Sequence, residues 1–303
     1  MLPSFVSFTG LYSGYLRRCF TGAGLFSQKI DVDTETTLHV WGPTNQATQK
    51  PSLVLIHGFG PMAIWQWRQQ VQFLAPHFNL YVPDLIFFGE STTRSKERSE
   101  KFQAESVGKL LEKLGVKKCH VAGTSYGGIV AYNMAKMLGE EKIEKVVICS
   151  SGVNMTKNHN VKLLERAGVE KIEDLMLPSS PQNLRKLMKL AVAKKIPYVP
   201  DFFLNDFLNK LYSENRKEKM ELLGGLSLGK IDTSNISPLQ QQEVLIIWGE
   251  DDKIFPVKMA HELKGIISKN ARIELMKEAS HVPQTEKPEE FNNIILKFLH
   301  SSS

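Results

Sequence analysis

The chain has 303 residues, which is enough to bury a sizeable core in one large α/β domain or two small ones. Hydrophobic residues make up 42% and charged residues 23%, and the formal net charge of +6 is spread without a basic block of the kind that binds nucleic acid. Three scattered cysteines, Cys19, Cys119 and Cys149, argue against a disulfide framework and a zinc site, so we expect no metal and a reducing compartment.

Residues 1–27 form the first segment. They contain Arg17 and Arg18 but no acidic residue, and apolar side chains recur at helical spacing between Leu11 and Phe20. Three interpretations stay open: a helix packed on the domain, a helix on a membrane surface, or an organellar transit segment. The chain contains no run of roughly 18 apolar residues that would predict a membrane-spanning helix. We therefore expect a cytoplasmic, peripheral membrane or organellar protein.

From residue 28 onward, apolar β-branched runs alternate with helical patterns. The first two runs follow each other without a helix, which indicates an antiparallel start. The alternation predicts a mostly parallel eight-stranded sheet with helices on both faces, in a core made of residues 28–153 and 240–303. We expect strands at 28–33, 36–41, 52–57, 79–83, 118–123, 145–150, 243–248 and 271–276, and helices at 64–75, 101–114, 126–138, 258–268 and 287–299.

Residues 154–239 break this alternation. They show no strand pattern, but leucine, methionine and phenylalanine recur at helical spacing between scattered prolines. Because the segment is inserted between two strands, we expect a helical lid domain above the carboxyl ends of the strands, where α/β sheets bind ligands. The alternative is an insertion that only packs.

A Gly-x-Ser-x-Gly motif runs from Gly123 to Gly127, between the strand at 118–123 and the helix at 126–138. A sharp strand-to-helix turn would project the hydroxyl of Ser125 above the sheet, and its glycines would let strand and helix approach closely. The helix N-terminus would then face the developing negative charge. We therefore expect Ser125 to be a nucleophile; the alternative is a serine in a tight glycine turn.

Two later strand ends supply partners for this serine. His281 follows the strand at 271–276, and three adjacent carboxylates follow the strand at 243–248. We expect His281 to take the serine proton and return it to the leaving group, while the acid orients the imidazole. We favour Asp252 as the acid, and Glu250 and Asp251 stay open as alternatives.

The turn at 57–60 follows the strand at 52–57. Its glycines let the backbone turn its amides inward, so we expect the N–H groups of Phe59 and Tyr126 to form an oxyanion hole. A plain glycine turn at a strand end is the alternative. Hydroxyl, imidazole and carboxylate suffice for the chemistry, so no cofactor is expected.

Aromatic residues near these motifs indicate an apolar acyl slot. We expect Gly58, Phe87 and Phe88 to contact the substrate, with Trp65 and the apolar lid completing the slot. Core packing is the alternative for each aromatic side chain.

Together these motifs resemble the α/β-hydrolase fold superfamily, in its lidded group of monoacylglycerol lipases, esterases and carbon–carbon bond hydrolases. The resemblance runs from about residue 28 to residue 299 and implies that Asp252 is the acid. Phe87-Phe88, in place of the usual Gly-His, is similar to plant members. The motifs that carry the resemblance are Pro83-Asp84-Leu85 through Gly89-Glu90-Ser91, Gly249…Asp252…Pro256 and Ser280-His281-Val282-Pro283.

Two departures narrow the implied chemistry. Ser125 stands where epoxide hydrolases and haloalkane dehalogenases carry Asp, and Val282 stands where ring-cleavage hydrolases typically carry Trp. The resemblance therefore implies a serine hydrolase that cleaves the ester of an apolar acyl group, such as a monoacylglycerol, through an acyl-enzyme. The alternatives are a carbon–carbon bond hydrolase, a hormone-type receptor with the same fold, and acyl transfer to an alcohol. A small-molecule ester or lipid, and a membrane contacted through the N-terminal segment, are the expected partners; the oligomeric state stays open.

Overall fold

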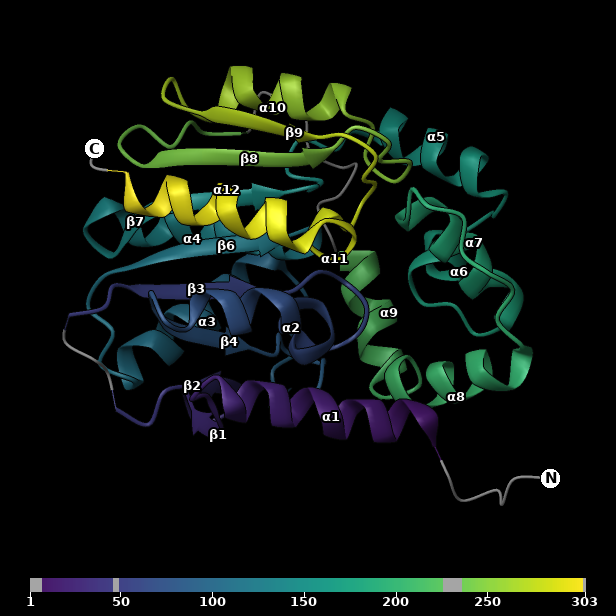
Figure 1. Cartoon of the computed structure of the whole chain (residues 1–303), viewed down its shortest axis with the longest axis horizontal. Coiled ribbons are helices and arrows are strands. Elements are labelled where there is room, and N and C mark those ends of the chain that lie inside the picture. The colour runs from purple at the N-terminus through teal and green to yellow at the C-terminus, as the bar shows by residue number, and fades with distance from the viewer. Residues whose placement is uncertain (1–6, 46–48, 226–235, 302–303) are drawn as a thin grey trace.

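A computed structural model describes residues 7–45, 49–225 and 236–301 (Figure 1). Across these ranges nine strands form one sheet in the order β1-β2-β4-β3-β6-β7-β8-β9, and β5 pairs with β2. The expected eight strands are corrected to nine, because β5 has two residues and no detectable period. The strands are β1 Phe26–Asp31, β2 Thr36–Gly42, β3 Ser52–Ile56, β4 Asn79–Pro83, β5 Thr92–Thr93, β6 Cys119–Thr124, β7 Ile143–Cys149, β8 Glu243–Gly249 and β9 Arg272–Met276.

The sheet begins antiparallel and continues parallel. β1 and β2 form an antiparallel pair, β2 is antiparallel to β4, and every pairing from β4 through β3, β6, β7 and β8 to β9 is parallel. The central strands β3, β4 and β6 are buried along their whole length, as expected for parallel strands covered on both faces. The predicted α/β architecture is confirmed.

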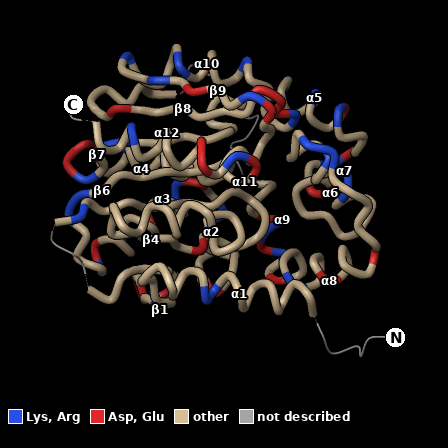
Figure 2. Tube along the Cα trace, in the orientation of Figure 1, with Lys and Arg blue, Asp and Glu red and all other residues tan. Residues whose placement is uncertain are grey.

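Helices cover both faces of the sheet. One apolar cluster joins the strands to α1, α2 and α12, and the other joins them to α3, α4 and α10. Lys, Arg, Asp and Glu are scattered over the whole molecule (Figure 2). These helices, with the short α11, are α1 Phe8–Gly22, α2 Ala63–Leu74, α3 Glu100–Lys113, α4 Tyr126–Lys142, α10 Lys258–Ile267, α11 Pro283–Glu286 and α12 Pro288–His300.

The described part of residues 154–239 is helical and contains no strand. Its helices gather beyond the carboxyl ends of the parallel strands, on the side to which the arrow of β8 points in Figure 1. Local signals delimit them: the hydroxyls of Thr156 and Ser180 cap α5 and α7, and Gly168 ends α5 in a left-handed conformation. The helices are α5 Lys157–Ala167, α6 Ile172–Met176, α7 Pro181–Ala191, α8 Asp201–Leu211 and α9 Arg216–Gly225.

The N-terminal segment contributes α1, which packs on the core. Leu16 and Phe20 are buried against α2, and the backbone N–H of Thr9 donates to the Asp206 carboxylate of α8 at 2.8 Å. The helix therefore joins the sheet domain to the helical insertion. Within the described ranges, no helix is long and apolar enough to span a membrane.

Candidate active site

Ser125 lies at the sharp turn between β6 and α4. Its backbone has a positive φ of 54° with ψ −120°, a conformation that residues other than glycine rarely adopt. A Cβ on Gly127 would lie 2.3 Å from the carbonyl oxygen of Ile56, and one on Gly123 would lie 2.1 Å from the carbonyl oxygen of Gly127. Only glycines fit at these two positions, so the motif sets the close approach of strand and helix that exposes the serine hydroxyl.

Neighbouring strand ends hold this turn. The N–H of Ser125 donates to the carbonyl oxygen of Cys149 at 2.8 Å, and the hydroxyl of Ser151 donates to the carbonyl oxygen of Ser125 at 2.7 Å. Burial raises the pKa of the Cys149 thiol to about 12. The thiol is therefore protonated near neutral pH and does not compete with the serine as a nucleophile.

The structure brings His281 to Ser125. Nε2 of His281 lies 2.9 Å from Oγ of Ser125, and Nδ1 lies 3.0 Å from Oδ2 of Asp252. Because a carboxylate only accepts, Nδ1 carries the proton and Nε2 is free to accept the serine proton. The arrangement can activate a hydroxyl for attack on a carbonyl.

Of the three adjacent carboxylates, Asp252 is the one that meets the imidazole. Its side chain is fully buried, and its Oδ1 accepts from the N–H groups of Ile254 and Phe255 at 2.8 and 2.9 Å. These bonds fix the carboxylate with the other oxygen toward the imidazole. Glu250 and Asp251 are exposed.

Both expected donors of the oxyanion hole lie beside the serine. α4 begins at Tyr126, so the N–H of this residue has no acceptor within the helix. Phe59 and Tyr126 line the same cavity as Ser125. The turn that carries Phe59 is held by Gln66, whose Oε1 accepts from the N–H of Gly58 at 2.8 Å and whose Nε2 donates to the Gly58 carbonyl oxygen at 3.1 Å.

His57 fixes the other side of this turn. Its Nδ1 donates to the carbonyl oxygen of Gly58 at 2.8 Å, and its Nε2 accepts from the N–H of Leu85 at 2.9 Å. Burial lowers the pKa of this imidazole, which keeps it neutral in both roles. No role was predicted for His57 or Gln66; the available signal was the position of His57 directly before Gly58.

Phe87 and Phe88 lie behind the oxyanion turn, in the core. The Phe88 ring packs edge-on against His57 and Phe59, with centroids 5.2 and 5.1 Å apart, and the guanidinium of Arg98 lies 4.5 Å from the Phe87 ring. Neither ring lines the cavity at Ser125. Both rings thus pack in the core, where Phe88 supports the turn, and the substrate contacts that we expected of them stay a prediction. Gly58, in contrast, lies against the serine, since a Cβ there would come within 3.0 Å of the Ser125 Cβ.

A cavity of about 240 Å³ opens at Ser125. The helical insertion and the strand ends both contribute to its wall, and Asn160 is a polar side chain within an otherwise mainly apolar lining. An apolar group of a substrate would thus meet apolar surface directly beside the nucleophile candidate. The insertion contributes Met155, Asn160, Leu163, Ile172, Met176, Leu223 and Gly224, and the β8–α10 loop contributes Ile254 and Phe255.

Hydrogen bonds tie the insertion to the histidine loop. The Ser280 hydroxyl donates to the Leu190 carbonyl oxygen at 2.9 Å. The Glu286 carboxylate accepts from the N–H of Ser280 at 2.7 Å and from the N–H of Ala193, just after α7, at 2.8 Å. One carboxylate thus holds both the residue before His281 and the end of α7. Sequence patterns gave no signal for this connection.

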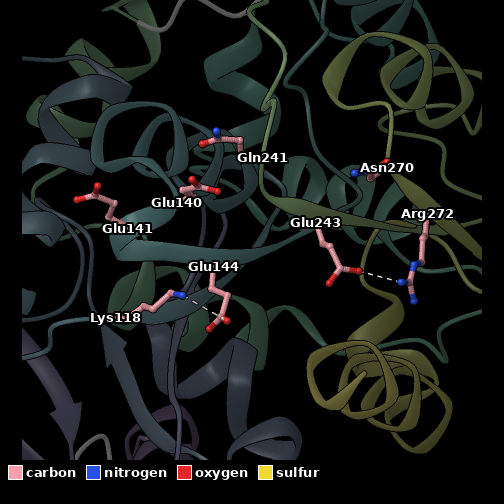
Figure 3. A pocket seen from close by; sticks show the side chains of 8 residues that line it. All are labelled: Lys118, Glu140, Glu141, Glu144, Gln241, Glu243, Asn270 and Arg272. Carbon is pink, nitrogen blue, oxygen red and sulfur yellow. Dashed lines mark hydrogen bonds and ion pairs between the residues drawn. The ribbon is translucent and has the colours of Figure 1, made fainter. Parts of the chain in front are cut away.

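A larger cavity, of about 770 Å³, lies at the amino ends of the strands, where β6 to β9 begin (Figure 3). Its wall is polar, and Lys118 pairs with Glu144 at 3.4 Å and Glu243 with Arg272 at 2.8 Å. Substrates of parallel α/β sheets bind at the carboxyl ends of the strands. The smaller cavity at Ser125 is therefore the candidate site.

A family model described as alpha/beta hydrolase fold matches residues 51–288. The chain belongs to this family. Monoacylglycerol lipase ABHD6 of Homo sapiens is 30% identical over 273 residues, which cover 83% of this chain and 76% of that protein. The 2-hydroxy-6-oxononadienedioate/2-hydroxy-6-oxononatrienedioate hydrolase of Pseudomonas sp is 25% identical over 256 residues, covering 82% of this chain and 87% of that protein.

Among solved structures, the 2-hydroxy-6-oxo-6-phenylhexa-2,4-dienoate hydrolase of Rhodococcus sp. strain RHA1 has the same fold. The TM-score is 0.75 at 22% identity, with 91% of this chain and 99% of that chain covered. Lipases, esterases and hydrolases recur among the family members that this chain resembles. The chain is an enzyme of this family, a serine hydrolase.

Proposed function

We propose that this enzyme cleaves the carboxylic ester of an apolar acyl group through an acyl-enzyme on Ser125. The observation that carries the proposal is the Ser125–His281–Asp252 hydrogen-bond chain, which opens into a mainly apolar cavity. A monoacylglycerol or another small neutral ester is the substrate class that we infer.

The reaction follows from the geometry. As Oγ of Ser125 attacks the ester carbonyl, Nε2 of His281 takes its proton, and the buried Asp252 carboxylate stabilises the imidazolium. The tetrahedral oxyanion forms against the N–H groups of Phe59 and Tyr126. His281 then protonates the leaving alcohol, and a water molecule, deprotonated by the same imidazole, releases the acid.

The lining of the cavity supports a neutral ester over a charged substrate. None of the described residues that line it carries a positive charge. The name of the Pseudomonas relative describes a dianionic substrate, whose carboxylates would require cationic partners in a desolvated site. The ABHD6 relative is named for a neutral lipid ester. Asn160 is the side chain that we expect to contact a hydroxyl of the alcohol group.

A fluorophosphonate probe tests the nucleophile. We expect wild type to be labelled and Ser125→Ala to remain unlabelled. A second serine requires its own control: Oγ of Ser27 lies 2.8 Å from Nε2 of His39, whose Nδ1 lies 2.8 Å from Oδ2 of Asp84. Ser27→Ala should be labelled like wild type, and labelling of Ser125→Ala that disappears only on adding Ser27→Ala would contradict the assignment.

A substrate panel tests the reaction class. Wild type should hydrolyse p-nitrophenyl esters of increasing acyl length and monoacylglycerols, with Ser125→Ala as the blank. Asn160→Leu should raise KM for a monoacylglycerol more than for a p-nitrophenyl ester, because only the former presents free hydroxyls. An enzyme that reacts with the probe yet turns over a dienoate and no ester would refute the proposal.

A further inference from the structure

The outer face of α1 is apolar. A helix that packs one side on a protein normally presents polar residues to water. α1 buries Leu16 and Phe20, yet no charged residue occurs in it before Arg17 (Figure 2). Large apolar side chains on its outer side are 37–65% exposed: Phe8, Leu11, Tyr12 and Tyr15.

The same surface continues onto the insertion. The Phe8 ring lies 4.7 Å from that of Phe203 in α8, and the neighbouring Phe202 is 57% exposed. Tyr198, in the loop between α7 and α8, is 79% exposed. We call this surface the aromatic face; it consists of Phe8, Leu11, Tyr12, Tyr15, Tyr198 and Phe202. Exposed apolar side chains that gather on one face mark an interaction site.

Two adjoining hollows lie beside the aromatic face. The first, of about 430 Å³, has an almost wholly apolar wall between α1, α7 and α8. The second, of about 630 Å³, lies under the 192–199 loop. They share part of their walls, because both are lined by Met188, Val192, Val199 and Leu204.

Cations surround the second hollow. Its described wall contains no acidic side chain, and of its cations only Arg185 forms an ion pair within the described residues, with Asp201 at 2.5 Å. Free lysines beside an apolar surface complement negative charge. The wall holds the cations Arg185, Lys189, Lys194, Lys195 and Lys253.

We propose that the aromatic face docks on a membrane surface that contains anionic lipid. Tyrosine, phenylalanine and leucine would enter the headgroup region, and Lys189, Lys194 and Lys195 would contact lipid phosphates. α1 has 15 residues, which suits a helix lying in the interface. A second copy fits less well, because the equivalent surface of that copy has no acidic side chain in the described wall of its second hollow to balance the unpaired lysines.

The docked orientation would also serve the reaction. Tyr212 lines the first hollow, and its hydroxyl lies 3.5 Å from the point that a Cβ on Gly60 would occupy. Gly60 belongs to the turn that carries Phe59, so the Tyr212 side chain connects the wall of the hollow with the oxyanion turn. This link rests on the proposed function; docking itself does not.

Vesicle sedimentation tests the docking with the inactive Ser125→Ala protein, so that failure of the catalytic proposal cannot affect the result. The probes are vesicles of phosphatidylcholine alone and with a third of phosphatidylglycerol. Binding should be at least about tenfold stronger to the anionic vesicles and should weaken with salt. Leu11→Asp/Tyr15→Asp and Lys194→Glu/Lys195→Glu should each weaken it by about tenfold or more.

Matched controls carry the same charge changes elsewhere. Met137→Asp/Val161→Asp replaces apolar side chains exposed outside the aromatic face, and Lys117→Glu/Lys136→Glu replaces exposed lysines. Both controls should bind like the parent protein, and all variants should keep its melting temperature. Equal binding by the face variants and the controls would overturn the proposal. So would a dimer in solution that Leu11→Asp/Tyr15→Asp dissociates, since the face would then belong to a second copy.

Discussion

Lys219→Met should stabilise this enzyme at neutral pH. Lys219 projects from α9 into the core, where it is 3% exposed and its ammonium lies 4.9 Å from the centroid of the Phe88 ring. Burial lowers the pKa of this lysine from 10.5 to about 8, although Glu214 and Asp84 act in the opposite direction. Methionine has a similar volume and brings no charge into the core.

The magnitude follows from the pKa. A fall from 10.5 to about 8 corresponds to about 3 kcal/mol against the charged form. The variant loses the contact of the ammonium with the Phe88 ring, which costs about 1 kcal/mol of stability. The expected net gain in the free energy of unfolding is therefore about 2 kcal/mol. Below pH 8 the lysine is charged in both states and the full penalty applies. Between pH 8 and 10.5 the folded state loses the proton first, so wild-type stability rises relative to the variant.

Urea unfolding at pH 7 and at pH 10 measures this difference, with Lys217→Met as the control at an exposed position of the same helix. The gain in free energy of unfolding should shrink toward zero as the pH approaches 10.5. Alkaline titration of other groups, such as Tyr126 with its raised pKa, is common to all three proteins. A gain that does not change with pH, or a loss of stability at pH 7, would refute the reasoning.

Three further substitutions probe the site. Asp252→Asn should lower kcat for an ester by about three orders of magnitude or more, because an amide cannot stabilise the imidazolium, while Asp251→Asn should stay within about twofold; similar losses would refute the choice of acid. Gly127→Ala should cost at least about 3 kcal/mol of stability in urea unfolding, because its Cβ would lie 2.3 Å from a carbonyl oxygen. Gly265→Ala is the control, since a Cβ at this position meets nothing within 4 Å. Glu286→Ala should lower kcat about tenfold with little change in melting temperature; unchanged kcat would mean that the carboxylate does not position the histidine loop.

Periodicity predicted most elements of the core to within about two residues. β3, expected at 52–57, is Ser52–Ile56, and α2, expected at 64–75, is Ala63–Leu74. The helix expected at 287–299 is α12, Pro288–His300. The short α11, Pro283–Glu286, was not predicted and is separate from α12, because Pro288 has no N–H with which to continue a turn from α11. The helices of the insertion could be predicted only as a group, since tertiary contacts decide where such short amphipathic segments end.

The site was predictable where chain order determines geometry. Ser125, Asp252 and His281 follow strands that end at one edge of a parallel sheet, so they meet once the sheet forms. Polar side chains that support the site, such as Gln66, do not recur at a regular spacing in the sequence. They could not be predicted, because their hydrogen-bond partners come together only in the folded turn. From the sequence, Phe88 could have faced the cavity or the core. In the structure, Asp84 bonds to His39 and to the N–H of Ala63 and anchors the start of the loop that carries Phe88, and the Phe88 ring packs into the core.

The bonds between α7 and the histidine loop restrict how the active site can admit a substrate. Moving the end of α7 away from the sheet would break the bond of the Ser280 hydroxyl to the Leu190 carbonyl oxygen and the bond of the Ala193 N–H to the Glu286 carboxylate. The N–H of Ser280 would keep its bond to Glu286, so the histidine loop would lose part of its restraint at this end of the insertion. Motion at the opposite end, where α8 meets α1, would leave all of these bonds intact. The aromatic face, which joins residues of α1 to Phe202 of α8, lies at this opposite end, so a movement there would change the face while the bonds to the histidine loop stay in place.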